Sequence, residues 1–294
     1  MKNTKLAYRW RQYSKQEKIV LPLFHLLLLI LAAYMILPLL FAILNSFKSI
    51  EAYYQSSMAF PAWSEIKWSN YVNALNLTYR NTSVLGMFGN TIYFVITFCI
   101  GNVGSSMCCA YVLSRFKFRG RNFLYALAIT IQIIPVFGTT GAGYMVLDEY
   151  GLIDNIWMIW ITGASGFDYM FLIFYSYFVN VASTYAEAAE IDGAGNFRIF
   201  WQIMVPMVLP AVFTMILSTI MTLWNDYATA LLYLPSYPTL ATGIYNLKSL
   251  AAYQEGGLTT YFAAIVIAMI PILLMFFFGQ VRILKINVDG GVKG

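Results

Sequence analysis

Six long stretches of this 294-residue chain carry almost no charge: 19–44, 84–113, 123–147, 156–181, 205–234 and 258–281. Each exceeds the ~18 apolar residues that indicate a membrane-spanning helix. Of the charged residues, only Asp168 and Asp226 lie inside the stretches. Because the stretches are too long for barrel strands and do not alternate polar with apolar residues, they predict an all-α polytopic membrane protein with six transmembrane helices.

The composition excludes several other classes of protein. Hydrophobic residues make up 60% of the chain and charged residues 11%, whereas soluble domains have about 25% charged residues. A disordered chain, an ordinary soluble enzyme and a nucleic-acid binder with a basic patch are therefore excluded. The first stretch is longer than the core of a signal peptide, about 7–15 residues, so we expect it to be a true transmembrane helix.

The placement of Lys and Arg predicts the orientation in the membrane, because cytoplasmic segments carry an excess of these residues. Fourteen of the 18 fall in the segments that would lie on one side of a six-span chain. We therefore expect one membrane domain over residues 1–294 with both termini in the cytoplasm. The predicted cytoplasmic segments include 1–18, 182–204 and 282–294, and the predicted external loops are 45–83, 148–155 and 235–257.

Residues that catalyse reactions or bind metals are scarce. The three cysteines lack CxxC spacing and there is one histidine, so neither a disulfide framework nor a metal site is predicted. The sequence has no GxxxxGK(S/T) phosphate-binding loop and no hydrolase motif, so we expect no catalytic residue and no bound cofactor. The second stretch instead has a face of small residues that lets another helix approach closely, made of Gly101, Gly104, Ser105, Cys108 and Cys109.

The segment between the fourth and fifth stretches predicts two short helices around a glycine turn. Thr184 and Glu187 have the spacing of a capping box, so a helix should begin at Thr184. Gly193 and Gly195 should end it. A second amphipathic piece is predicted from the spacing of Phe197, Phe200, Trp201 and Met204. From the residues alone, a helix that docks on a partner and an interfacial hairpin without a partner are equally consistent.

This segment resembles the EAA loop of ABC importer permeases, the membrane subunits of binding-protein-dependent uptake systems. The family pattern is EAA, then Gly after three residues, then a hydrophobic–Pro ending. Here it reads Glu187-Ala188-Ala189, Gly193 and Ile203 to Pro206, and Asp192 and Ala194 complete the sugar-importer form EAAxxDGA. The chain departs from the pattern at Val205, where Leu is frequent, and by lacking a proline just upstream.

Weaker matches extend the resemblance along nearly the whole chain. They resemble the maltose-type branch, which takes up oligosaccharides. The matches are Asn90-Thr91, Ala110 to Arg115, Phe118 to Arg121, Trp224-Asn225-Asp226-Tyr227 and Gly290 to Gly294.

The resemblance implies a type I ABC importer permease fold and transport by alternating access, without covalent chemistry in this chain. The EAA helix would be a coupling helix seated in a cleft of a separate ATPase, and the residues implied at that contact are Glu187, Ala188, Ala189, Asp192, Gly193 and Ala194. The implied partners are a second homologous permease, two ATPase subunits that bind ATP and Mg, a solute-binding protein and membrane lipid. The implied location is the cytoplasmic membrane of a bacterium or archaeon. Nucleic acid is not among the implied partners.

Acids inside a membrane are functional candidates, because burying one costs about 2.5 kcal/mol or more. Carboxylates and amides bond to sugar hydroxyls, and aromatic faces stack on sugar rings, so we expect a substrate pathway near these acids. The candidates are Asp226, Asn225, Trp224, Tyr227 and Asp168. The alternative is that these side chains only bond to a neighbouring helix or to a broken backbone segment.

Two other functions remain open at this point. A non-sugar ABC permease would keep the mechanism and change the substrate. A stand-alone secondary transporter would need coupling-ion ligands and usually an internal repeat, and the sequence shows neither clearly.

Overall fold

The computed structural model describes residues 14–134, 138–251 and 257–289, and these residues are mostly helical. The first half of the chain forms α2 (Glu17–Ser46), α3 (Ile50–Gln55), the 3-10 turn η1 (Trp63–Glu65), α4 (Ser69–Asn76), β1 (Thr78–Tyr79), β2 (Thr82–Ser83), α5 (Val84–Arg115), α6 (Arg121–Ile133) and α7 (Thr139–Glu149). The second half forms α8 (Met158–Gly163), α9 (Tyr169–Asn180), α10 (Thr184–Ile191), α11 (Asn196–Ile199), the π-helical segment η2 (Phe200–Met204), α12 (Val205–Met207), α13 (Leu209–Trp224), α14 (Ala228–Tyr233), α15 (Leu240–Leu250) and α16 (Gly257–Asp289).

Three of the predicted spans are single helices. α2, α5 and α16 are each long and apolar enough to cross a membrane. The other three predicted spans are interrupted. Residues 123–147 contain α6 and α7, residues 156–181 contain α8 and α9, and residues 205–234 contain α12, α13 and α14. Residues 196–207 and α13 meet at an angle of 78°, and they add a fourth span if they are counted as one. The total of six spans and the cytoplasmic location of both termini remain predictions.

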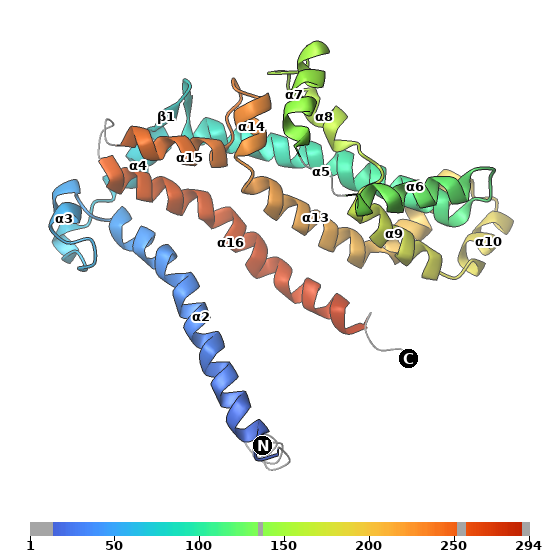
Figure 1. Cartoon of the computed structure of the whole chain (residues 1–294), viewed down its shortest axis with the longest axis horizontal. Coiled ribbons are helices and arrows are strands. Elements are labelled where there is room, and N and C mark those ends of the chain that lie inside the picture. Colours follow the sequence, from blue (N-terminus) through green and yellow to red (C-terminus); the bar gives the residue numbers. More distant parts are fainter. Residues whose placement is uncertain (1–13, 135–137, 252–256, 290–294) are drawn as a thin grey trace.

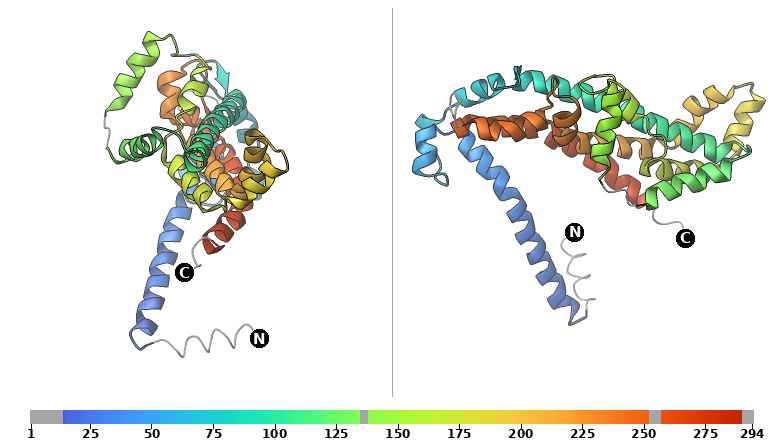
Figure 2. Two further views of the ribbon diagram at one scale, coloured as in Figure 1. Left: turned by 90° about the vertical axis from the view of Figure 1, so that its right-hand side faces the viewer. Right: turned by 45° about the horizontal axis from the view of Figure 1, so that its top comes forward.

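The helices form an elongated bundle. α5, α13 and α16 follow its long axis, with α3 and α4 at one end and α10 at the other (Figure 1). α2 meets the bundle only near its C-terminal end and otherwise stands apart (Figure 2). Most of its apolar side chains are exposed, as expected for a helix that faces lipid or another subunit.

The buried side chains form two clusters, one toward each end of the bundle. The cluster near α10 joins the second half of α5 to α9, η2 and the start of α13, with Phe171, Phe174 and Phe178 fully buried. The other cluster joins the first half of α5 to α15, α16 and the end of α13. We call them the inner and outer clusters. α5 contributes side chains to both.

The predicted small-residue face of α5 is confirmed in part. A Cβ on Gly101 would lie 3.4 Å from the backbone of Gly163, at the end of α8. The Ser105 hydroxyl accepts a hydrogen bond from the N–H of Gly166 at 3.2 Å, and Cys109 lies against the same residue. Small side chains thus let the break between α8 and α9 lie directly on α5.

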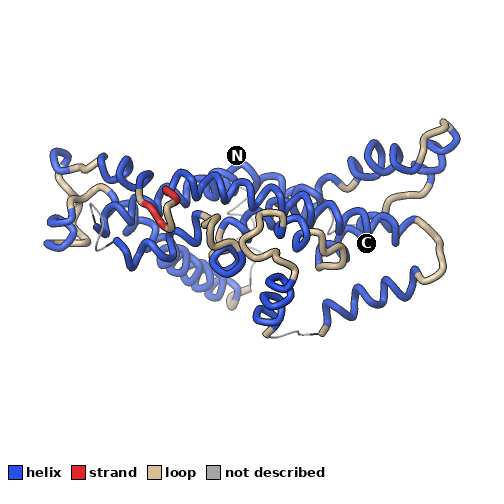
Figure 3. The backbone as a smooth tube through the Cα atoms, turned by 90° about the horizontal axis from the view of Figure 1, so that it is seen from above, coloured by secondary structure: helices blue, strands red, loops and turns tan. Residues whose placement is uncertain are grey.

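The segment after α2 is folded around a buried lysine. Lys48 is 2% exposed, and its ammonium group donates to the carbonyl oxygens of Ser56 and Ser57, each at 3.0 Å. Desolvation lowers the pKa of Lys48 below its ordinary value. Further along, β1 and β2 form a short antiparallel hairpin that leads into α5 (Figure 3). There the Ser83 hydroxyl accepts from the N–H of Gly86 and caps the helix.

Candidate functional site

The EAA segment forms the expected helix, but the N-terminus of this helix is not capped in the way that was predicted. α10 begins at Thr184, which confirms the predicted start. The prediction of a capping box formed by Thr184 and Glu187 is wrong. The N-cap residue is Ser183, with helical φ −64° and ψ −27°, and no side chain caps the helix. A capping side chain reaches the free N–H groups only from an extended residue, so this backbone does not allow it.

Gly193 ends α10 as predicted. Its φ of +80° is left-handed, a conformation that glycine adopts without the steric cost of a Cβ. The N–H of Gly193 donates to Glu190 O and the N–H of Ala194 donates to Ala189 O, at 3.0 and 2.9 Å. This pair of bonds is a Schellman motif, which satisfies carbonyls at the helix end. Gly195 has an ordinary φ of −73°, so the turn depends on Gly193.

One face of α10 packs on the bundle and the other is exposed. Ala189 is 8% exposed and belongs to the inner cluster. Glu187, Ala188 and Asp192 are exposed, and Ile191 is 87% exposed. Two large apolar side chains of this short helix, Tyr185 and Ile191, are thus exposed beside acidic groups at one end of the molecule (Figure 1). A group of exposed apolar side chains is the kind of surface that a partner protein covers.

The second amphipathic piece is divided between two faces. Phe200 and Met204 are buried in the inner cluster, whereas Phe197 and Trp201 are exposed. The π-helical segment η2 starts at Phe200, and its wider turn changes the register that a 3.6-residue period predicts. The four residues therefore do not form the single apolar face that their spacing suggested.

Asp168 joins two helices through four hydrogen bonds. Its carboxylate accepts from the backbone N–H groups of Met170 and Phe171, at 3.0 and 3.1 Å, and so caps α9. It also accepts from the side chains of Asn102 and Ser106 on α5, at 2.8 and 2.7 Å. The charge is stabilised by these donors and by the N-terminus of α9.

Asp226 occupies the break between α13 and α14. Its Oδ1 accepts from the N–H groups of Ala228 and Thr229, at 3.0 and 3.1 Å, at the start of α14. The break is also tied to α15, because the Thr242 hydroxyl donates to the carbonyl oxygen of Tyr227 at 2.8 Å. The backbone between Asn225 and Tyr227 is therefore fixed.

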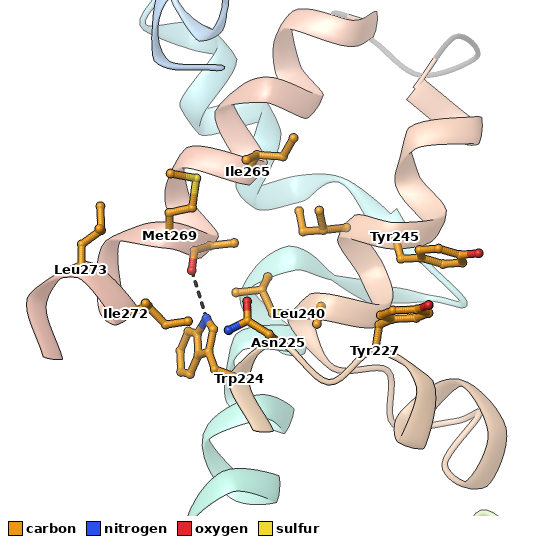
Figure 4. A pocket seen from close by; sticks show the side chains of 12 residues that line it. Trp224, Asn225, Tyr227, Leu240, Tyr245, Ile265, Met269, Ile272 and Leu273 are labelled. Carbon is orange, nitrogen blue, oxygen red and sulfur yellow. Dashed lines mark hydrogen bonds between the residues drawn. The ribbon is translucent and has the colours of Figure 1, made fainter. Parts of the chain in front are cut away.

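A pocket of about 380 Å³ opens beside this break (Figure 4). Of the predicted pathway residues, Trp224, Asn225 and Tyr227 line it. Asp226 is next to it in sequence and Asp168 belongs to the α5–α9 contact, so the structure does not bring all five together. Trp224 is buried, and its indole N–H donates to Ala268 O on α16 at 3.0 Å. The Trp224 ring is therefore a fixed part of the pocket wall.

Tyr245 is a lining residue that the sequence reasoning missed. Its ring is stacked on that of Tyr227, with centroids 4.4 Å apart and planes 13° apart. Both rings are exposed along one side of the pocket (Figure 4). Residues 235–257 were expected to be a loop, yet Leu240, Ile244 and Leu247 have helical spacing. That spacing was the available signal for α15.

These features agree with the comparisons with known proteins. Residues 101–285 match the family described as binding-protein-dependent transport system inner membrane component. The chain belongs to this family. It is therefore a membrane subunit of a binding-protein-dependent transport system, and it is a transport component rather than an enzyme.

Two relatives and one solved structure show the likeness over almost the full length. A diacetylchitobiose uptake system permease of Streptomyces coelicolor is 30% identical, over 88% of this chain and 84% of its own. A maltodextrin transport system permease of Bacillus subtilis is 28% identical, over 92% of this chain and 95% of its own. A crystal structure of a bacterial ABC transporter that imports the acidic polysaccharide alginate has a similar fold, with a TM-score of 0.73, 24% identity and coverage of 91% and 98%.

The comparisons confirm the predicted class, an importer permease that works with a solute-binding protein and lies in the inner membrane. They also exclude a stand-alone secondary transporter, because the family depends on a binding protein.

Proposed function

We propose that this chain imports a carbohydrate by alternating access, as one of two permease subunits driven by a separate ATPase. The substrates in the names of the two relatives, diacetylchitobiose and maltodextrin, support a carbohydrate. ATP and Mg²⁺ would bind to the two ATPase subunits, since the sequence has no phosphate-binding loop. The alternative is a non-sugar ABC permease with the same mechanism.

The observation that carries the proposal is the exposed face of α10. Glu187, Ala188 and Asp192 are exposed at one end of the molecule, where a helix could enter a cleft of the ATPase. Glu187 would form an ion pair there. Gly193 and Ala194 close the turn that holds the helix, and Ala189 packs it on the bundle. Movement of the ATPase would thus reach the membrane domain through this contact.

The six predicted spans and the cytoplasmic termini belong to the same proposal. Each interrupted span would cross the membrane as a broken helix, which is tolerated where the free backbone groups are bonded inside the protein. Asp168 and Asp226 supply such bonds at two of the breaks. A second permease and lipid would cover the exposed apolar surface of α2.

We assign the substrate pathway to the pocket beside the α13–α14 break. Asn225 and Tyr227 provide an amide and an aromatic face, Tyr245 extends that face, and Asp226 and Trp224 hold the wall in place. Ligand pockets of about 300–1,000 Å³ with mainly apolar walls and few polar groups are typical of small-molecule sites. Asp168 accepts hydrogen bonds from four donors within the chain, which favours the alternative that it only bonds to a neighbouring helix and to a broken backbone segment.

The test is uptake by the whole complex, reconstituted in vesicles with its ATPase and binding protein. We expect ATP-dependent uptake of a labelled oligosaccharide. Tyr245→Ala should raise the KM for uptake roughly two- to tenfold, because an aromatic stacking contact is lost, and Tyr245→Phe should not. Tyr144, which is paired with Tyr233 outside this pocket, gives the control Tyr144→Ala.

Two results would count against the proposal. Uptake of a peptide or phosphate in place of sugar would establish the non-sugar alternative. An unchanged KM in Tyr245→Ala would remove the pocket from the pathway and leave the substrate to the other permease.

A further inference from the structure

α5 is a single helix that reaches both candidate sites. It has 32 residues, which at 1.5 Å per residue gives a length of about 48 Å. No break interrupts it between Val84 and Arg115, whereas three of its neighbours, α8, α9 and α13, are pieces of interrupted spans. It contributes buried side chains to the inner and the outer clusters.

The inner end of α5 holds the start of the EAA segment. Arg115, the last residue of α5, donates from Nη2 to the carbonyl oxygens of Phe178 and Val181, at 2.6 and 2.5 Å. These carbonyls belong to the C-terminal end of α9, where the backbone lacks intrahelical donors and favours a cation. Val181 lies three residues before the start of α10 at Thr184. Arg115 therefore fixes the point from which α10 leaves the bundle.

Tyr111, one turn before Arg115, holds the other side of the same segment. Its ring lies 5.5 Å from that of Phe178 and 4.7 Å from that of Phe200, centroid to centroid. Phe178 precedes α10 and Phe200 follows it. Because both flanks of α10 contact the last turns of α5, a displacement of α10 must move this end of α5 or break these contacts.

The outer end of α5 holds the start of α15. The Asn90 side-chain amide donates to Pro238 O at 3.0 Å, and the Thr91 hydroxyl accepts from the N–H of Leu240 at 2.8 Å. The helices also lie very close, since a Cβ on Gly243 would be 2.0 Å from the sulfur of Met87. α15 cannot shift along α5 without disturbing these contacts.

α15 in turn forms a wall of the pocket. Leu240 and Tyr245 line it, and Thr242 bonds to the backbone of Tyr227. A continuous set of contacts therefore leads from α10 through α5 to the stacked tyrosines.

We propose that α5 transmits the displacement of α10 to the pocket wall as one rigid strut, with Arg115 as the positioning residue at its inner end. This inference rests on the proposed function, since it assumes that α10 meets the ATPase. Arg115 touches neither substrate nor ATP. Its effect is on how many substrate molecules are carried for each ATP hydrolysed.

The experiment measures uptake and ATP hydrolysis in the same vesicles with the complete complex. Arg115→Gln should lower the number of sugars transported per ATP by roughly tenfold, within the usual range for coupling between sites. ATP hydrolysis should continue. Arg115→Lys, which keeps a charged donor for the α9 carbonyls, should restore part of the ratio. Arg121→Gln is the control, because its contacts to Ser114 O and the Tyr175 hydroxyl are long, at 3.5 and 3.4 Å.

A second variant acts at the other end of the strut and covers the case in which Arg115→Gln does not assemble. Asn90→Ala should lower the same ratio, and the double variant should lose no more than the worse single one, because both interrupt one path. An unchanged ratio in Arg115→Gln or in Asn90→Ala overturns the strut, as does a fully additive loss. Absence of ATP-dependent sugar uptake by the wild-type complex would instead refute the proposed function.

Discussion

The carboxylate of Asp168 shows how a single charged residue is accommodated in an apolar chain. Its four donors come from α5 and from the first turn of α9. The four donors satisfy both carboxylate oxygens inside the bundle, and two of them are backbone N–H groups at the N-terminus of α9. The residue thus stabilises the break between α8 and α9 and joins that break to α5.

Asp168→Asn is therefore expected to reduce stability and to leave transport parameters unchanged. An amide presents one acceptor oxygen in place of two and adds a donor, so it cannot accept all four hydrogen bonds. The expected loss is about 1–3 kcal/mol, seen as a lower melting temperature of the purified complex. Asp148→Asn, at an exposed position on α7, is the control. A raised KM at unchanged stability would instead place Asp168 in the substrate pathway.

Asp168 and Asp226, the two acids inside apolar stretches, could be found from the sequence, but their partners could not. A charge inside an apolar stretch is visible in the residues themselves. Whether it meets substrate or backbone depends on Asn102 and Ser106, which are more than 60 positions away. Tyr245 was missed for a similar reason, because its contact with Tyr227 requires α15 to fold back on the α13–α14 break.

At the level of elements, hydropathy located the helices better than it located their interruptions. α2, α5 and α16 coincide closely with three predicted spans. The breaks near Asp168 and Asp226 lie in stretches whose flanks are equally apolar, so a hydropathy average passes over them. At both breaks an aspartate side chain accepts hydrogen bonds from N–H groups at the start of the following helix, which is a feature of one residue rather than of a window.

The turn after α10 gives a prediction with an internal control. Gly193→Asp should uncouple transport from ATP hydrolysis while the protein still inserts, because φ of +80° places a side chain in a strained conformation. Gly195→Asp should be tolerated, since Gly195 has φ −73° and no close neighbour around its Cβ position. Uptake and ATP hydrolysis in vesicles are the measurements. Wild-type coupling in a correctly inserted Gly193→Asp variant would remove the turn from the mechanism.

At the scale of the whole molecule, the exposed length of α2 and the exposed face of α10 indicate a subunit rather than a self-sufficient transporter. Both surfaces carry large apolar side chains that remain exposed among the residues that the structure describes. They differ in surroundings, since α2 has almost no charge along its length and α10 presents Glu187 and Asp192. A membrane environment suits the first surface, and an aqueous protein partner suits the second.

The interrupted third span is the most demanding test of the predicted topology. α6 and α7 have 13 and 11 residues, so each is about 20 Å long or less. Neither crosses a hydrocarbon core of about 30 Å alone, whereas the two in series could. Cysteine labelling in a cysteine-free background separates these cases. If the pair crosses, Lys117→Cys and Asp148→Cys report opposite sides of the membrane.

We expect a membrane-impermeant maleimide to label Asp148→Cys in intact cells and Lys117→Cys only after permeabilisation. Both side chains are exposed, so access to the thiol depends on the side of the membrane. Ser64→Cys and Ser14→Cys, also exposed and both ahead of α6 in the chain, calibrate the external and cytoplasmic signals. Labelling of Lys117→Cys and Asp148→Cys from the same side would mean that α6 and α7 do not span. The chain would then cross the membrane one time fewer, and every later segment, including α10, would lie on the opposite side of the membrane relative to α2.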